Sequence, residues 1–197
     1  MGPKPAQDDR PARYEYRVWG ENRKARKLMA KMASDKSIDE FRDCYFLTDD
    51  ATFNAKVRDN TLKIKELVAE KKGFERWASG RYQASDDVPT PFDVLFDELK
   101  LERPQNGKKY DLEKAIDKLD PKLGVRSIFV TKTRRRYQIG SVLAEVTDIE
   151  IDDSGDVLRT LAIEGDDLEE LVSLRKKLGL RDEENVAMHQ VVDEQHD

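Results

Sequence analysis

The sequence predicts an α+β fold in which an antiparallel sheet curves or closes around a charged interior and amphipathic helices pack outside it. Three observations support this prediction: successive segments alternate apolar and polar residues, the turns between them are short, and other stretches carry apolar residues at helical spacing. The chain has 197 residues, which suits one large domain that can bury most of its apolar surface.

Eight segments alternate as strands do. They are residues 13–19, 43–48, 53–58, 61–67, 73–78, 126–137, 142–151 and 157–164. Four further segments have helical periodicity, namely 22–33, 92–100, 112–119 and 167–178. Sequential strands with short turns favour antiparallel pairing, with the helices outside the sheet or at its ends.

The composition limits the classes of function. Charged residues make up 39% of the chain and the net charge is −5, which argues against general nucleic-acid binding. No apolar run is long enough for a membrane-spanning helix. The one cysteine, Cys44, excludes a disulfide within the chain and favours a reducing compartment, so we expect a cytoplasmic protein in which this thiol is buried and inert.

The termini have a different composition from the middle of the chain. Residues 1–11 are Pro-rich and polar, so we expect a disordered tail before a domain that spans residues 12–189. Residues 190–197 are expected to be an acidic C-terminal tail. Both histidines, His189 and His196, fall at this end, where a solvated tail is a better interpretation than a metal site.

Residues 53–67 form the first predicted hairpin with a cationic face. A two-residue turn at Asp59-Asn60 would pair Arg58 with Thr61, Lys56 with Lys63 and Asn54 with Lys65. Alternation then gives one apolar face and one face with four cations. Like charges opposite each other destabilise a sheet, so such a face needs either full solvation or a bound anion.

Two other strand regions repeat this design. Lys132, Arg134 and Arg136 share a face of the strand 126–137, and a turn at Ile139-Gly140 would put Glu145 opposite Arg134. Near the N-terminus, Arg13, Glu15 and Arg17 share a face of 13–19. If the apolar faces pack against the helices, the charged faces meet inside a tunnel. Lys and Arg suit a chain of phosphates, and carboxylates among them suit a hard divalent cation.

The order of these segments resembles the CYTH domain family, also called triphosphate tunnel metalloenzymes, over about residues 13–189. The matching pieces are Glu15-Tyr16-Arg17, Asp43-Cys44-Tyr45-Phe46, Lys56-Val57-Arg58, Leu62-Lys63-Ile64-Lys65, Lys132-Thr133-Arg134, Ala144-Glu145-Val146 and Ala162-Ile163-Glu164. The resemblance implies an eight-stranded antiparallel β-barrel and action on a triphosphate with Mg²⁺ or Mn²⁺.

The resemblance also implies roles for individual residues. The phosphate ligands would be Arg17, Lys56, Arg58, Lys63, Lys65, Lys132, Arg134 and Arg136. The metal ligands would be Glu15, Glu145 and Glu164. Two departures concern the metal site. Arg13 stands where the family pattern E-x-E-x-K has its first Glu, with Arg17 at its Lys, and Ala162 stands where a later E-x-E has its first Glu.

Three functions follow from these features. The first is a metal-dependent hydrolase of a triphosphate, either inorganic tripolyphosphate or an organic one; an adenylate cyclase is a weaker variant because nothing selects adenine. The second is a protein that binds a polyphosphate without turnover, since two expected carboxylates are missing. The third is an interaction domain with solvated charged strands. The partner expected for the first two is a small polyanion, with no nucleic acid and no membrane.

Overall fold

A computed structural model describes residues 11–59, 61–83, 125–152 and 154–194. The strands are β1 (Arg13–Trp19), β2 (Asp35–Leu47), β3 (Phe53–Arg58), β4 (Thr61–Lys71), β5 (Phe74–Gln83), β6 (Arg126–Ile139), β7 (Val142–Ile151) and β8 (Val157–Gly165). The helices are α1 (Arg23–Met32), α4 (Leu168–Leu178) and α5 (Met188–Glu194). The expected tail before residue 11 and the expected helices at 92–100 and 112–119 lie outside the described residues.

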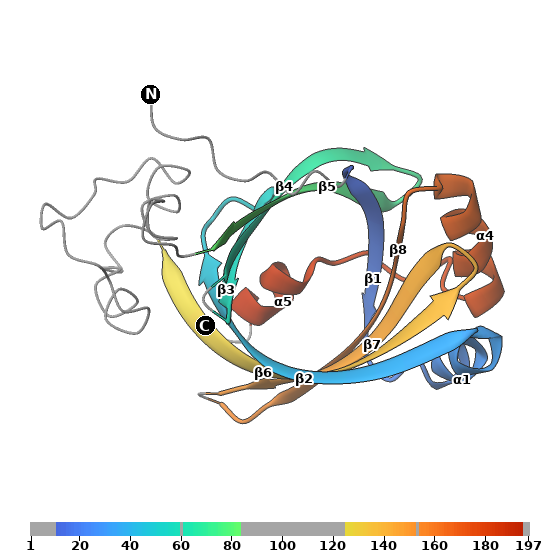
Figure 1. Cartoon of the computed structure of the whole chain (residues 1–197), viewed down its shortest axis with the longest axis horizontal. Coiled ribbons are helices and arrows are strands. Elements are labelled where there is room, and N and C mark those ends of the chain that lie inside the picture. The colour runs from blue at the N-terminus through green and yellow to red at the C-terminus, as the bar shows by residue number, and fades with distance from the viewer. Residues whose placement is uncertain (1–10, 60, 84–124, 153, 195–197) are drawn as a thin grey trace, which may run out of the picture.

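The eight strands form a closed antiparallel barrel in the order β1-β5-β4-β3-β2-β6-β7-β8 (Figure 1). The predicted α+β fold is therefore confirmed. Because the described strands close into a ring, the alternation along each strand separates an inner face from an outer face all around the barrel.

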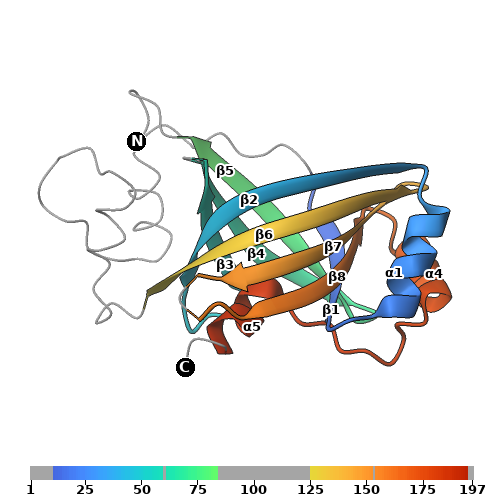
Figure 2. The same ribbon diagram turned by 90° about the horizontal axis from the view of Figure 1, so that it is seen from below.

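The outer face of one side of the barrel packs against α1 and α4, which lie together at one end of the ring in both views (Figures 1 and 2). Tyr16, Val146 and Ile163 of the strands pack with Met29 of α1 and Leu171 of α4, and all five side chains are buried. The carboxylate of Asp167 caps α4 by accepting hydrogen bonds from the backbone N–H groups of the first turn, as expected for an N-cap. This packing leaves the opposite face of each strand to line the interior.

The barrel interior is apolar at one end and charged in the middle. Tyr45, Ile128, Val130 and Ile149 form an apolar cluster with Met188 and Val192, which α5 inserts from the C-terminus. Helix α5 is seen behind the ring of strands in Figure 1. Further along β6, the inward positions change from Val130 to Lys132 and then to arginines. The interior thus has an apolar plug at one end and a polar chamber beyond it.

The C-terminal helix changes the expected organisation of that end. Val192 is fully buried, so the packed structure continues past the boundary expected between residues 189 and 190. The interpretation of His189 as part of a solvated tail is wrong, because its side chain is buried. Its ring nitrogen Nε2 lies 3.1 Å from the Ala51 carbonyl oxygen, and the ring packs edge-on against Trp77. The stripe Met188, Val192 is too short to predict a helix from periodicity.

Two hairpins test the predicted registers. The first is confirmed: Lys56 pairs with Lys63, Arg58 with Thr61 and Asn54 with Lys65. The second register is wrong, because the turn lies one residue later than predicted, at Gly140-Ser141, and Ile139 pairs with Val142. Glu145 therefore lies opposite Arg136 and not Arg134. Gly140 has φ of +60°, a backbone conformation that favours glycine at the start of a tight turn.

Strand β2 is much longer than the predicted segment 43–48, since it begins at Asp35 and pairs with β6 along its whole length. Residues 35–40 are mostly exposed, and Ile38 is an exposed apolar residue. Because this half of the strand has no apolar face, alternation gave no sign of it. Cys44 is buried as predicted, and burial raises the pKa of its thiol to about 12, so the thiol is protonated at neutral pH.

Candidate functional site

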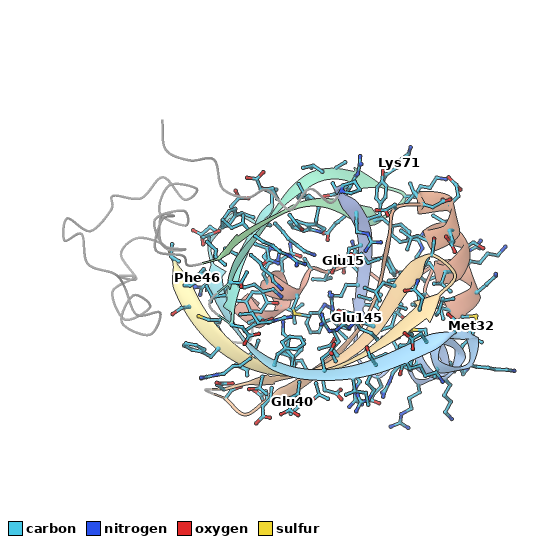
Figure 3. The ribbon with its side chains drawn as sticks, viewed as in Figure 1. Glu15, Met32, Glu40, Phe46, Lys71 and Glu145 are labelled. Carbon is cyan, nitrogen blue, oxygen red and sulfur yellow. The ribbon has the colours of Figure 1, made fainter. Side chains whose placement is uncertain are left out.

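A cavity of about 390 Å³ occupies the charged part of the barrel interior. All eleven predicted site residues line it: Arg17, Lys56, Arg58, Lys63, Lys65, Lys132, Arg134, Arg136, Glu15, Glu145 and Glu164. Figure 3 shows Glu15 and Glu145 inside the ring of strands, whereas Glu40 and Lys71 lie on its outside. The predicted tunnel with a shared cationic lining is therefore present. Its size falls near the lower end for small-molecule pockets.

Asp43 of β2 anchors one wall of the cavity. This carboxylate has no solvent exposure and accepts bonds from Lys56 Nζ at 3.1 Å, Lys132 Nζ at 3.0 Å and Arg58 Nε at 2.6 Å. Burial opposes its ionisation, but the charges of Lys56 and Lys132 hold the pKa of Asp43 well below its usual range. One buried anion therefore fixes three cations from the two strands β3 and β6, and those cations exceed its charge.

Aromatic side chains complete this wall. The Tyr45 hydroxyl oxygen accepts from Lys132 Nζ at 2.6 Å, and the Arg58 guanidinium lies 3.4 Å from the centre of the Phe41 ring. Cation–π contact holds the basic groups in place without neutralising their charge. Burial lowers the pKa of Lys132, as it does that of Lys56. Asp43 opposes this loss of positive charge at both lysines, and the Tyr45 hydroxyl opposes it at Lys132.

Lys63 is the cation with the least compensation. It lies opposite Lys56 on β3 and opposite Arg81 on β5, so three basic residues form a row across three strands. Within the described part of the chain, no carboxylate forms an ion pair with Lys63. Partial burial lowers its pKa to about 8, with Arg58, Lys56 and Arg81 adding repulsion. The positive potential that lowers the pKa of this amine also attracts a multivalent anion.

The arginines of β6 form a second basic group. Asp39 of β2 accepts from Arg136 Nε at 2.8 Å and from Arg134 Nη2 at 3.3 Å. Arg134 also lies 4.7 Å from the Phe41 ring, and its Nη1 lies 3.8 Å from Glu145 Oε2. Two guanidinium groups thus share one partly exposed carboxylate, and both line the cavity.

The carboxylates of β1 and β7 are joined by an arginine. Arg17 Nη2 donates to Glu15 Oε1 at 2.9 Å and to Glu145 Oε1 at 2.8 Å. The second oxygen of Glu15 accepts from Lys65 Nζ at 2.9 Å. Burial opposes the charge of Glu15, yet Lys65 and Arg17 hold its pKa well below the usual range. Burial opposes the charge of Glu145 as well, but Arg17 and Arg134 lower its pKa. Both glutamates are therefore ionised and already paired with cations of the protein.

Glu164 lies beside this network but has its own partner. It pairs with Glu15 in the register of β1 and β8, and Arg13 Nη1 donates to its Oε1 at 3.0 Å. Arg13 Nε also reaches Asp166 at 3.2 Å. Arg13, which stands where the family pattern has a glutamate, thus forms an ion pair with Glu164.

The three glutamates are chemically suited to a hard divalent cation, because carboxylate oxygens are its preferred donors. Their arrangement does not fit one as it stands. A guanidinium lies between Glu15 and Glu145, another covers Glu164, and the described residues contain no group of three or more His, Cys, Asp or Glu side chains placed to hold a metal.

Sequence reasoning missed three residues of this site. Asp43 and Tyr45 share the inward face of β2, and a basic tunnel needs some buried counter-anion, so alternation could have found both. Arg81 was missed because the predicted strand ended at residue 78, whereas β5 continues to Gln83. Arg13 was recognised as a departure, but its ion pair with Glu164 depends on a register that the sequence does not give.

Comparison with known proteins shows the fold. No protein-family model and no curated protein matches the chain. Among solved structures, PH1012 from Pyrococcus horikoshii OT3 aligns with a TM-score of 0.55 and 18% identity over 90% of this chain and 98% of that chain. A conserved hypothetical protein from Pyrococcus furiosus gives 0.54 and 18% over 90% and 98%. PH1819 from Pyrococcus horikoshii OT3 gives 0.52 and 14% over 93% and 99%.

These likenesses establish a shared barrel and leave activity to be argued from the site. The chain has the closed tunnel fold that its resemblance to the CYTH proteins implies. No helix in the described part of the chain has the length and apolar character needed to cross a membrane.

Proposed function

We propose that this protein binds a triphosphate or a similarly short polyphosphate inside the barrel. The observation that carries the proposal is the pair of Lys56 on β3 and Lys63 on β4, which lie directly opposite each other inside the barrel. Like charges directly opposite each other destabilise a sheet. A phosphate chain would supply negative charge between these two lysines and accept hydrogen bonds from both side chains.

The balance of charge in the cavity supports the same ligand. Among the described residues, ten basic side chains and three carboxylates line the cavity, and the paired Asp43 and Asp39 add two negative charges behind it. These ten basic side chains outnumber the five carboxylates. Basic groups enter from β1, β3, β4, β5 and β6, so a ligand with charge spread along its length satisfies more of them than a compact anion.

The apolar end of the barrel gives the ligand a direction. Met188 of α5 lines the cavity, and its sulfur contacts both Tyr45 and Lys132. A phosphate chain would therefore place its end near the Asp43 cluster and extend away from α5. We expect the rest of an organic triphosphate, if there is one, to lie toward the opposite opening.

Hydrolysis of a terminal phosphoanhydride with Mg²⁺ or Mn²⁺ is a second candidate function. It is favoured by the presence of Glu15, Glu145 and Glu164 in the same cavity as the cations. Such reactions need positioning and charge neutralisation more than a protein nucleophile. The ion pairs of these carboxylates argue against a preformed metal site, so hydrolysis ranks behind binding.

Calorimetric titration with sodium tripolyphosphate tests the binding function, with sulfate as a compact anion for comparison. We expect a single site for tripolyphosphate and weak or no binding of sulfate. Lys63→Met should weaken tripolyphosphate binding roughly 10- to 100-fold, as expected for one charge-assisted hydrogen bond. Lys27→Met on the exposed face of α1 is the matched control and should change nothing.

A phosphate-release assay on the same samples tests hydrolysis. Tripolyphosphate, thiamine triphosphate and nucleoside triphosphates are each incubated with Mg²⁺, with Mn²⁺ and with EDTA. Release of phosphate would establish the second function and name the substrate. Binding without release would leave a triphosphate-binding protein, and the absence of both would overturn the proposal.

A further inference from the structure

Arg17 occupies the position between two carboxylates at which a divalent cation would be expected. Its Nη2 atom bonds Glu15 Oε1 at 2.9 Å and Glu145 Oε1 at 2.8 Å, and its Nε bonds Glu15 Oε1 again at 3.1 Å. Its Nη1 atom donates to Thr160 Oγ1 at 3.3 Å on the neighbouring strand β8. The side chain is 7% exposed, so this guanidinium is enclosed by its partners.

The second oxygens of Glu15 and Glu145 also face cations, and Glu164 has a basic partner of its own. Glu15 Oε2 faces Lys65 Nζ at 2.9 Å, and Glu145 Oε2 faces Arg134 Nη1 at 3.8 Å. Glu164 is bound by Arg13. A metal would have to displace three guanidinium groups and an ammonium group to reach all three carboxylates. Each displaced cation would then remain in the interior without its partner, which is unfavourable in a site largely shielded from water.

From this arrangement we propose that Arg17 is a built-in replacement for a metal ion and that the tunnel binds its triphosphate in the metal-free form. The inference rests on the proposed binding function and deepens it by naming the form of the ligand. A triphosphate complexed with Mg²⁺ carries less negative charge and has fewer free oxygens. The cavity, with its excess of fixed cations, should therefore prefer the uncomplexed anion.

The role of Arg17 is one of positioning within the site. It holds Glu15 and Glu145 together, and through Glu15 it fixes Lys65, which reaches the cavity from β4. A lysine at this position would keep the charge, but its single ammonium could not repeat the fork of bonds to Glu15, Glu145 and Thr160. At least one carboxylate would then be released for another cation.

Calorimetry of the full chain with tripolyphosphate tests the inference, first in EDTA and then with enough Mg²⁺ to complex the ligand. We expect binding in EDTA to be at least tenfold tighter than with Mg²⁺. Binding that is equally tight, or that requires Mg²⁺, would overturn the inference and leave the proposed function intact. Absence of binding under both conditions would instead contradict the proposed function itself.

Titration of Mn²⁺ without ligand, followed by its electron paramagnetic resonance signal, provides a readout independent of triphosphate. The wild-type protein should show no site at submillimolar Mn²⁺. Arg17→Lys, checked for folding by circular dichroism, should bind Mn²⁺ at least tenfold more tightly. The control Arg23→Lys, on the exposed face of α1, should behave as wild type. A submillimolar Mn²⁺ site in the wild type would overturn the proposal.

Discussion

Lys56 of β3 lies directly opposite Lys63 of β4, so two ammonium groups meet inside the barrel. Lys56 has Asp43 as a partner at 3.1 Å, whereas no carboxylate in the described part of the chain pairs with Lys63. Lys65, two residues further along the same face, is paired with Glu15 at 2.9 Å. Lys63 is thus repelled by its neighbours, whereas Lys65 on the same face of the strand is stabilised by a carboxylate. Mutation of each lysine can measure this difference.

Lys63→Met should make the free protein more stable, because it removes a repelled charge. We expect the free energy of unfolding to rise by about 0.5–1 kcal/mol, the scale of a cross-strand pair. Lys65→Met is the matched control on the same strand, and it should lower stability because Glu15 loses a partner. Urea unfolding of the three proteins measures both effects. A destabilised Lys63→Met variant would contradict the account of this row.

Binding of tripolyphosphate should weaken as the pH rises above about 8. The pKa of Lys63 is lowered to about 8 in the free protein, and a bound anion favours the charged amine, so the pKa of Lys63 is higher in the complex. Binding therefore takes up a proton, and affinity falls by up to about tenfold per pH unit between the two pKa values.

Lys63→Arg separates this effect from titration of the ligand itself. Arginine stays charged throughout the range, so the variant should retain only the pH dependence that comes from tripolyphosphate. The measurement is the dissociation constant at pH 7 and pH 9.5 for both proteins. Identical slopes would show that Lys63 does not titrate in the site.

Asp43→Asn should destabilise the free protein strongly, since Lys56, Arg58 and Lys132 would lose their shared anion. Removing one partner of a buried ion pair costs about 3–5 kcal/mol. Urea unfolding measures this loss, and added tripolyphosphate should recover more stability in the variant than in the wild type, because the ligand then supplies the missing charge. Recovery by an equal amount would place the ligand away from this cluster.

The same carboxylate gives the wild type a defined acid sensitivity. The pKa of Asp43 is depressed in the folded state, so its contribution to stability is fully present above the unfolded value of about 3.9 and is lost as the pH falls toward the folded value. The wild type should therefore lose stability below pH 4. Asp43→Asn should lose less, as followed by thermal unfolding between pH 5 and pH 3. Equal losses in both proteins would show that Asp43 is not the group that titrates.

Helix α5 should contribute to stability although the sequence suggested a tail. Val192→Ala removes two methyl groups from a fully buried side chain and should cost about 2 kcal/mol. Val157→Ala makes the same chemical change at a residue that is 62% exposed, and it should stay within about 0.5 kcal/mol of wild type. Equal effects would mean that α5 is not packed in the barrel.

The cationic lining could be predicted because strand alternation has a period of two. Once the turn at Asp59-Asn60 was recognised, the pairing of Lys56 with Lys63 followed directly. The turn of the next hairpin was misplaced by one residue, which moved Glu145 from Arg136 to Arg134. This error left Glu145 on the same face of β7, so the prediction that Glu145 points inward was still correct.

The ion pairs could not be predicted in the same way. Arg17 bridges Glu15 of its own strand and Glu145 of β7, and this contact depends on the closure of β1 against β8. Composition gives no information about that closure. Residues 35–40 of β2 have no apolar face, so no strand-like alternation is visible there. Helix α5 has only seven residues, too few to show a helical repeat of apolar residues.

The most direct test of the central claim is a crystal structure of the protein grown with tripolyphosphate in EDTA. We expect a phosphate chain inside the barrel, with its oxygens within hydrogen-bond distance of Lys56 and Lys63. Arg17 should remain between Glu15 and Glu145 in that structure. Tripolyphosphate bound only on the outer surface, for example at the basic face of α1, would contradict the central claim.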